Sequence, residues 1–409
     1  MRCSLLIVFA ILSCAAAQTM KLLHEWKYID YLWRSDEQKR NAIDSGDYNY
    51  TQVFLIDSDR APGKIFVTTP RFPGVPASLS TVSRRRGAGG PLLKPYPSWS
   101  WHKKNDCSGI SSVWRTIINY KVDPGYCQHL WVLDSGQKGV CDAQFLVFDL
   151  ASDKLIRRIP IPANYANNMK NEGLLITPAI ESDDQCRNSW VYAADVEGGG
   201  LIVLDVAREK LRRLEMEVFK AETSKATLTI AGESFYLADG IFGLAVPNGL
   251  GSNPRRLYFR PLASLNEYSI ELKDLHRSLH SEKDVPYLKY NYTFPSQAAS
   301  QAASRDGILF FGLTSQTAIA CWNTRTPMNE RNVDIVYRDE NLLQFTSGVK
   351  IVDYPGTESL SVVSNRYQKI ALGTMDFSEV NFRILFEPVD SLVRRSKCNS
   401  TRYVSFFLP

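Results

Sequence analysis

The side chains that most often carry catalytic or metal chemistry are few in this chain. Of its five histidines, only His276 and His280 stand four residues apart, a spacing that places two imidazoles on one face of a helix. Such a pair supplies half of a zinc site. The neighbouring Arg277, Glu282 and Lys283 indicate a solvated helix surface instead. We therefore expect no metal site.

Carboxylates are the next candidates, because several aspartates follow apolar runs. We expect these aspartates to bond the backbone of the turns that follow, rather than to bind a cation in a central channel. The sequence contains no HExxH, GxSxG or P-loop motif and no GxGxxG pattern after a strand. An acid–base pair of carboxylates distant in sequence stays open, but no catalytic residue and no cofactor is assigned. The aspartates concerned are Asp134, Asp149, Asp195 and Asp205.

An internal repeat indicates the secondary structure that would position any functional site. Residues 130–162 and 189–217 share one pattern, in which Trp131 corresponds to Trp190, 59 residues later. Each copy holds three short apolar runs separated by Gly-rich or charged turns, which is typical of an antiparallel meander. A lone sheet cannot bury both faces, so the copies must pack around one another. A chain of 409 residues has room for about six such units, the range in which β-propellers close.

The remaining pattern favours one all-β domain over residues 18–409. Strand-like runs recur throughout, and no break in composition divides the chain. Helical pattern is confined to residues 29–42 and 272–283. Residues 296–304 read SQAASQAAS, a duplication of small polar residues for which we expect a loop or a weakly specified sheet edge.

The N-terminus predicts export. Met1-Arg2 precedes an apolar run over residues 5–12, and Ala15-Ala16-Ala17 supplies small residues before Gln18. This arrangement is typical of a secretory signal peptide, residues 1–17, and the apolar run is too short to span a bilayer. We therefore expect a secreted, extracellular protein with no membrane segment. A net charge of +5 is mild for this length and argues against a nucleic-acid partner.

Cysteines and sequons agree with export. The even number of cysteines beyond the signal peptide predicts disulfides, for which fifteen pairings exist. The repeat favours Cys127–Cys186, since each lies four residues before its matching Trp. Three Asn-X-Thr sequons predict surface glycosylation, at Asn49, Asn291 and Asn399. The cysteines are Cys107, Cys127, Cys141, Cys186, Cys321 and Cys398.

A family pattern runs almost from end to end of the chain. Its segments include His24-Glu-Trp-Lys-Tyr-Ile-Asp30, Gly74-Val-Pro-Ala-Ser-Leu79, Pro95-Tyr-Pro-Ser-Trp-Ser-Trp101, Leu130-Trp-Val-Leu-Asp-Ser-Gly136, Asp239-Gly-Ile-Phe-Gly243, Cys321-Trp-Asn323 and Val380-Asn-Phe-Arg383. In order and coverage these segments resemble the yellow/major royal jelly protein family of insects, and most closely its royal-jelly branch. Residues 119–126 and 296–304 depart from the family pattern.

The resemblance implies a six-bladed β-propeller of four-stranded antiparallel sheets, with secretion and glycosylation. It also implies three disulfides, Cys107–Cys141, Cys127–Cys186 and Cys321–Cys398. Some salivary relatives are similar to amine binders, and three of their pocket positions fall on Ser347, Asn365 and Tyr367. By that resemblance Asn365 would bond a polar group of the ligand, Tyr367 would stack on a ring or an ammonium, and Ser347 would supply a hydroxyl.

Three functions follow from the resemblance. The first is a non-enzymatic nutritive, storage or small-molecule carrier protein, with self-association or a small protein partner. The second is an enzyme similar to the dopachrome-converting members of the family, which act in the melanin pathway. The third is a binder of an amine, a catechol or a sterol in the central cavity. The absence of catalytic motifs favours the first.

Overall fold

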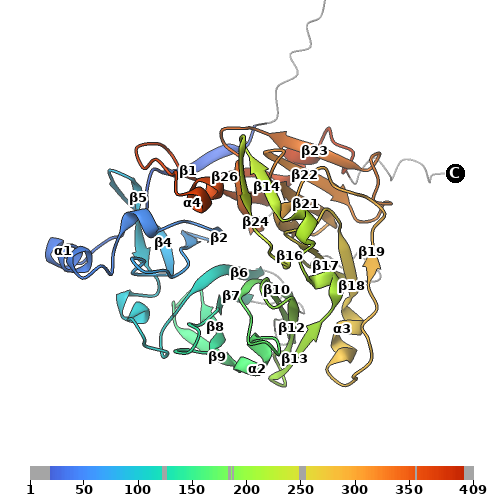
Figure 1. Cartoon of the computed structure of the whole chain (residues 1–409), viewed down its shortest axis with the longest axis horizontal. Helices are drawn as coiled ribbons and strands as arrows, with labels where there is room; N and C mark the ends of the chain where they lie inside the picture. Colours follow the sequence, from blue (N-terminus) through green and yellow to red (C-terminus); the bar gives the residue numbers. More distant parts are fainter. Residues whose placement is uncertain are drawn as a thin grey trace, which may run out of the picture.

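Six four-stranded antiparallel sheets surround a central axis in the computed structural model, which describes residues 19–121, 127–182, 186, 188–247, 255–354 and 357–399. Figure 1 shows the sheets following one another around the centre in chain order. The predicted six-bladed β-propeller is thereby confirmed. The predicted signal peptide, residues 1–17, lies outside the described residues, as do residues 122–126 of the departure before Cys127.

The first three blades are the following. Blade 1 holds β2 (Asp57–Ala61), β3 (Lys64–Thr68), β4 (Leu79–Gly87) and β5 (Gly90–Pro95). Blade 2 holds β6 (Val113–Lys121), β7 (Cys127–Asp134), β8 (Ala143–Asp149) and β9 (Leu155–Ile161). Blade 3 holds β10 (Leu175–Ser182), β11 (Ser189–Asp195), β12 (Gly200–Asp205) and β13 (Lys210–Glu215).

The remaining blades complete the ring. Blade 4 holds β16 (Ile241–Ala245), β17 (Arg256–Pro261), β18 (Tyr268–Glu271) and β19 (Leu288–Lys289). Blade 5 holds β20 (Ala298–Ala303), β21 (Ile308–Leu313), β22 (Ala318–Asn323) and β23 (Val333–Arg338). Blade 6 holds β24 (Phe345–Tyr354), β25 (Thr357–Asn365), β26 (Phe382–Pro388) and, as its outermost strand, β1 (Lys21–Trp26).

The ring closes through pairing of the two ends of the chain. Strand β1 runs antiparallel to β26, with Trp26 opposite Phe382 and Glu25 opposite Arg383. The last blade therefore needs the N-terminal strand to become four-stranded. A disulfide between Cys321 in β22 and Cys398 fastens the segment after helix α5 (Val389–Val393) to blade 5.

The repeat seen in the sequence corresponds to blades 2 and 3. Trp131 lies in β7 and Trp190 in β11, the second strands of these blades, so the spacing of 59 residues is the step from one blade to the next. Strands β8 and β12 read as continuous apolar runs because both of their faces are buried against neighbouring blades.

Residues 296–304 form a sheet edge rather than a loop, which confirms the second of the two expectations for them, although this edge is buried. They supply β20, the innermost strand of blade 5, whose residues 298–302 are buried. Inner strands of successive blades converge at the axis, and β20 packs beside both β16 and β24. Alanine and serine suit this position because they allow close approach of the neighbouring backbones.

Helices and one extra hairpin decorate the blades. The helical pattern over residues 29–42 is borne out only from Asp36, in α1 (Asp36–Asp44), where the side chain of Ser35 accepts a hydrogen bond from the Gln38 amide. The pattern over 272–283 gives α3 (Leu272–Ser278). The other elements are α2 (Ala163–Ala166), α4 (Tyr367–Leu372), the hairpin of β14 (Thr227–Ile230) with β15 (Glu233–Tyr236), and short 3-10 turns including η1 (Tyr50–Gln52). Within the described ranges, no helix is both long and apolar enough to span a membrane.

Candidate functional site

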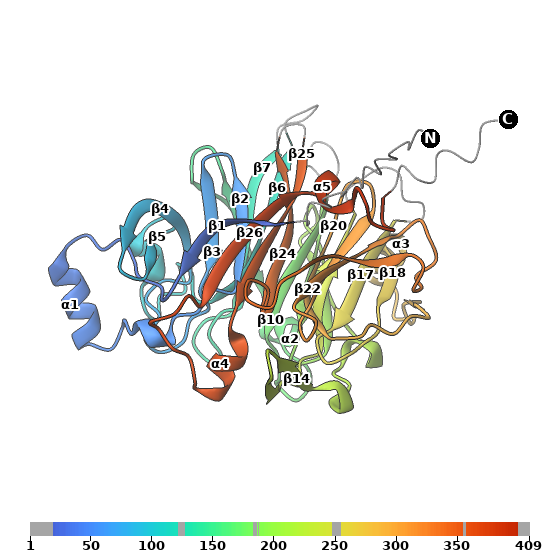
Figure 2. The same cartoon turned by 90° about the horizontal axis from the view of Figure 1, so that it is seen from above.

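A cavity of about 1320 Å³ opens on one face of the propeller. Its walls come from residues at the beginnings of the inner strands, among them Ile56, Trp114, Ile176 and Phe242, and from loops between the second and third strands of several blades. Figure 2 shows α2, α4 and β14 on the same side of the molecule, at the lower edge of the view. The cavity exceeds the usual size range for sites that take small molecules.

Aromatic side chains form the wall next to blade 6. The rings of Phe345 and Tyr367 are stacked, with centroids 5.0 Å apart and an interplanar angle of 30°. Phe235 of the extra hairpin also contacts Tyr367, at 5.6 Å between centroids. The buried face of that hairpin, which includes Leu228 and Ile230, supports this wall from behind. Tyr367 is thus held by its neighbours while its ring borders the cavity.

Two carboxyl groups of the cavity wall interact electrostatically, and one of them also influences the pKa of Tyr367. Asp239 is only partly exposed, and Glu197 is exposed at the rim. Burial raises the pKa of Asp239 to about 7, and the charge of Glu197 adds to the shift. Burial, followed by the charge of Asp239, also raises the pKa of Tyr367. Near neutral pH, Asp239 therefore changes its charge inside a largely aromatic wall.

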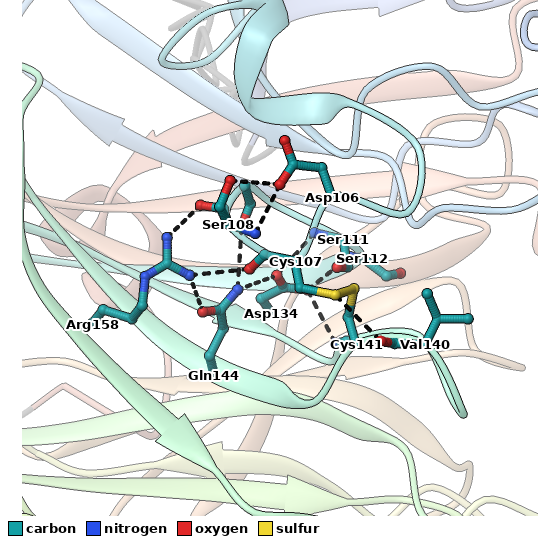
Figure 3. The surroundings of a disulfide bond; sticks show 12 residues. Asp106, Cys107, Ser108, Ser111, Ser112, Asp134, Val140, Cys141, Gln144 and Arg158 are labelled. Carbon is teal, nitrogen blue, oxygen red and sulfur yellow. Dashed lines mark hydrogen bonds between the residues drawn. A yellow bond between two sulfur atoms is a disulfide. The ribbon is translucent and has the colours of Figure 1, made fainter.

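The blade 2 side of the cavity is held by a disulfide, shown in Figure 3. Cys107 and Cys141 join the loop before β6 to the loop between β7 and β8. Beside them Asp134 is fully buried and accepts hydrogen bonds from the amides of Ser111 (2.9 Å) and Ser112 (2.7 Å). It also accepts from the Gly136 amide and the Gln144 side chain. These bonds fix the wall, and they confirm the turn-bonding role expected for Asp134.

The other strand-end aspartates act in the same way. Asp149 accepts from the Ser152 amide at 2.7 Å, Asp195 from the Gly198 amide at 3.0 Å, and Asp205 from the Ala207 amide at 3.0 Å. Their role as turn-bonding residues is thereby confirmed.

A buried polar layer closes the axis next to the cavity. Arg115 of β6 is almost completely buried and donates to the Ser300 hydroxyl at 3.0 Å and to the Ala299 carbonyl at 3.1 Å. It also donates to the Ser347 carbonyl of β24. Its guanidinium lies 4.7 Å from the ring centroid of Phe242, which lines the cavity. One cation thus connects blades 2, 4, 5 and 6.

The three predicted ligand residues occupy two different environments. Tyr367 borders the cavity. Asn365 and Ser347 are buried, and Asn365 Nδ2 donates to Ser347 Oγ and to the Leu55 carbonyl, both at 3.0 Å. Ser347 Oγ in turn donates to the Ile56 carbonyl at 2.6 Å. The structure therefore brings Ser347 and Asn365 together behind the wall, and direct ligand contact by these residues stays a prediction.

Sequence reasoning missed the residues that dominate the cavity. In the sequence, Asp239 stands out only as the first residue of the family segment Asp239-Gly-Ile-Phe-Gly243, and nothing singles out Glu197. Phe242 and Phe345 lie in ordinary strand-like runs. A carboxyl residue just before a strand that begins with an aromatic residue is only a weak sequence signal of a binding site. The segments that line the cavity come together only when the blades form a ring.

The predicted modifications have the following surroundings. The three disulfides are those implied by the family resemblance, and they are typical of extracellular proteins. Asn49 and Asn291 are exposed, and Asn399 is partly buried. Glycosylation at these three residues stays a prediction.

His276 does not lie on a solvated helix surface, which corrects the expectation for this residue of the pair. Its Nε2 lies 2.8 Å from Glu181 Oε2, and its ring stacks on Trp190 with centroids 3.9 Å apart. Arg255 binds the other oxygen of Glu181 at 2.8 Å. These contacts dock α3 on blade 3, whereas His280 is exposed. Within the described part of the chain, no group of three or more His, Cys, Asp or Glu side chains is arranged to hold a metal ion.

The fold and cavity define a six-bladed β-propeller with a chamber at one end of its axis. The sequence profile described as major royal jelly protein matches residues 116–398. Major royal jelly protein 9 of Apis mellifera is 41% identical over 406 residues, covering 96% of this chain and 93% of that protein. Major royal jelly protein 8 of the same species is 38% identical over 402 residues, covering 93% of each. The chain belongs to the major royal jelly protein family, which confirms the resemblance read from its motifs.

A solved structure provides a more distant comparison. The luciferin-regenerating enzyme aligns with a TM-score of 0.46 and 14% identity, over 84% of this chain and 92% of that one. This similarity is too low to bear on function.

Proposed function

We propose that this protein is an extracellular carrier that holds a small organic cation in the cavity. The observation that carries the proposal is Asp239, a partly buried carboxyl that lines the same cavity of about 1320 Å³ as the ring of Tyr367 and whose charge adds to the burial-driven rise in the pKa of that tyrosine. A protonated amine satisfies both groups, because its charge pairs with the carboxylate and its apolar body covers aromatic surface. The volume of the cavity leaves room for a ligand larger than a simple amine.

Binding of a cation would also change the protonation of Asp239. The pKa of this carboxyl is raised to about 7 by burial and by Glu197, so near neutrality part of the population is neutral. A bound ammonium favours the ionised form and lowers that pKa. Affinity for the cation therefore rises as pH increases from 5.5 to 8, with a proton released on binding.

The secreted setting rests on several agreeing features. The sequence begins with a segment typical of a signal peptide, the chain contains three disulfides, and its relatives are named as royal jelly proteins. A nutritive or storage role is compatible with carriage of a ligand. Native mass spectrometry of the secreted protein, before and after denaturation, detects a carried amine or sterol as mass that is lost on denaturation.

The decisive experiment compares two ligands that differ in charge. Tyramine carries an ammonium group, whereas 4-ethylphenol has a similar ring without it. We expect calorimetry to show tyramine binding at least about tenfold more tightly than 4-ethylphenol, a difference of about 1.4 kcal/mol. Asp239→Asn should remove that preference. Asp142→Asn, the same change at an exposed cavity residue, should preserve it. Equal affinities for the two compounds in the wild type would refute a cation site.

A second candidate function is favoured by the same carboxyl. A side chain with a pKa of about 7 is suited to general acid–base catalysis at neutral pH, as isomerisation of a catechol-derived substrate such as dopachrome requires. The test is loss of dopachrome absorbance by the wild type and by Asp239→Asn. If dopachrome absorbance falls no faster than in buffer, the enzymatic function is excluded. The carrier function is then tested by the binding experiment alone.

A further inference from the structure

A second, smaller groove lies beside the mouth of the cavity. It encloses about 570 Å³ between α1, the segment around η1 and the loop between β3 and β4. Four residues line both the groove and the cavity, so the two spaces adjoin: Gly46, Phe72, Pro73 and Gly74.

The groove exposes an unusual amount of apolar surface. Ile43, Tyr50 and Phe72 all line it, with 50%, 42% and 41% of their surface exposed. Tyr50 is held in place by contacts with the rings of Tyr28 and Phe377, at 4.8 and 5.5 Å between centroids. The lining includes no charged side chain. A contiguous exposed patch of this kind normally has an occupant, and here it must be uncharged and present apolar faces.

One residue of the groove is itself an attachment point. Asn49 lines the groove, is exposed, and begins the sequon Asn49-Tyr-Thr51. Its Oδ1 accepts hydrogen bonds from the Thr51 backbone amide at 3.1 Å and from the Thr51 hydroxyl at 2.8 Å. The backbone N–H of Asn49 donates to the Gly74 carbonyl at 2.9 Å. Among the described residues, Nδ2 of Asn49 takes part in no hydrogen bond. The side chain is therefore oriented by its oxygen, and its nitrogen is left for a sugar.

We infer that the first sugars of an N-linked glycan on Asn49 fold back into this groove and cover it. Glycosylation forms a bond between Nδ2 and the anomeric carbon of a polyisoprenyl-diphosphate-linked oligosaccharide; Nδ2 loses one proton and the diphosphate leaves. Sugar rings are uncharged, and their C–H faces pack on aromatic rings such as those of Tyr50 and Phe72. Because the groove adjoins the cavity, the glycan also forms part of the cavity rim. This inference does not depend on what the cavity binds.

The chain offers a matched control, since Asn291-Tyr-Thr293 is a second Asn-Tyr-Thr sequon. Asn291 is exposed and lines neither of the two spaces. The full chain is produced in a secretory insect-cell host, and site occupancy is read by mass spectrometry. Native protein is then treated with an amidase that cleaves N-glycans, and the release rate is measured at each site. We expect release from Asn49 to be at least about tenfold slower than from Asn291, which corresponds to protection of about 1.4 kcal/mol.

Variants separate packing in the groove from other causes of slow release. Tyr50→Ser keeps the sequon but removes the ring, so release from Asn49 should become as fast as from Asn291. Tyr292→Ser makes the same change in the other sequon and should leave the Asn49 rate unaltered. Thr51→Ala abolishes attachment and should increase the fluorescence of a hydrophobic dye, whereas Thr293→Ala should not. An unmodified Asn49, or equal release rates at the two sites of the wild type, overturns the inference.

Discussion

Arg115 in blade 2 donates a hydrogen bond to Ser300 in blade 5, 3.0 Å away across the axis of the propeller. The same guanidinium bonds to Ala299 and lies over Phe242. In a ring of six sheets, each blade packs mainly on its two neighbours, so a contact between non-adjacent blades couples parts that would otherwise interact only through the ring. The small side chains of β20 allow Arg115 to reach this position.

We predict that Arg115→Met lowers the free energy of unfolding by about 3 kcal/mol or more. Loss of the guanidinium removes the hydrogen bonds that Arg115 donates to the Ala299 and Ser347 carbonyls and to the Ser300 hydroxyl, which then accepts only from the Val349 amide. It also removes a charge that opposes the burial-driven rise in the pKa of Asp57. Denaturant unfolding followed by tryptophan fluorescence measures the change. Arg84→Met, at an exposed position, should change stability by less than about 0.5 kcal/mol. Similar effects of the two substitutions on the free energy of unfolding would contradict a stabilising role of Arg115 between the blades.

Asp239→Asn should alter how stability depends on pH. The folded-state pKa of Asp239 is raised to about 7, so between its ordinary value of 3.8 and 7 the folded protein holds a proton that the unfolded chain releases. Stability of the wild type therefore falls as pH rises through this window. The Asn variant lacks the effect and should be more stable than the wild type at pH 8 by about 1–2 kcal/mol, with little difference at pH 4. Thermal unfolding of ligand-free protein at both pH values checks this, and a difference independent of pH argues against titration of Asp239.

Removal of the Cys107–Cys141 disulfide by a double Ser substitution should affect both stability and the cavity. The bond closes a loop of 34 residues, and its loss should cost about 2–4 kcal/mol. Cys141 itself lines the cavity, so affinity for a cavity ligand should fall as well. Removal of Cys321–Cys398, which lies between blade 5 and the C-terminal segment, should reduce stability while leaving ligand affinity within about twofold. Calorimetric titration of the two variants distinguishes these outcomes.

His276→Ala should loosen the contact of α3 with blade 3. Burial raises the pKa of Glu181, but the hydrogen bond and charge of His276, together with Arg255, outweigh it and leave that pKa below its ordinary value. A carboxylate of this kind contributes stability above its unfolded-state pKa and loses it as pH falls through the folded-state value. The variant should therefore be less stable by about 1–2 kcal/mol at pH 6, and the difference should shrink towards pH 3. His280→Ala, at an exposed residue, serves as the control in the same unfolding experiments.

The blade architecture was predictable because its signals are local. Period-two alternation, turn residues and the recurrence of Trp131 as Trp190 all depend on neighbours within one sheet. The aspartates at strand ends were predictable for the same reason, since Asp149 and Asp205 bond amides two or three residues away. For β20, local composition left a loop and a sheet edge both open, because small polar residues are common in loops; in the structure they form the inner edge strand, where small side chains meet the steric demand of the propeller axis.

The candidate site depended on closure of the ring, which sequence alone does not reveal. Asp239 precedes blade 4 and Tyr367 follows the second strand of blade 6, yet both face one cavity. Likewise, His276 has charged sequence neighbours that favour solvent, but α3 docks it against Glu181 in another blade. The repeated sheets, the family and the turn-bonding residues follow from the sequence, because they rest on short-range patterns. Which distant carboxyl, ring and guanidinium groups meet is a property of the folded ring, because it depends on how six blades converge on a single axis.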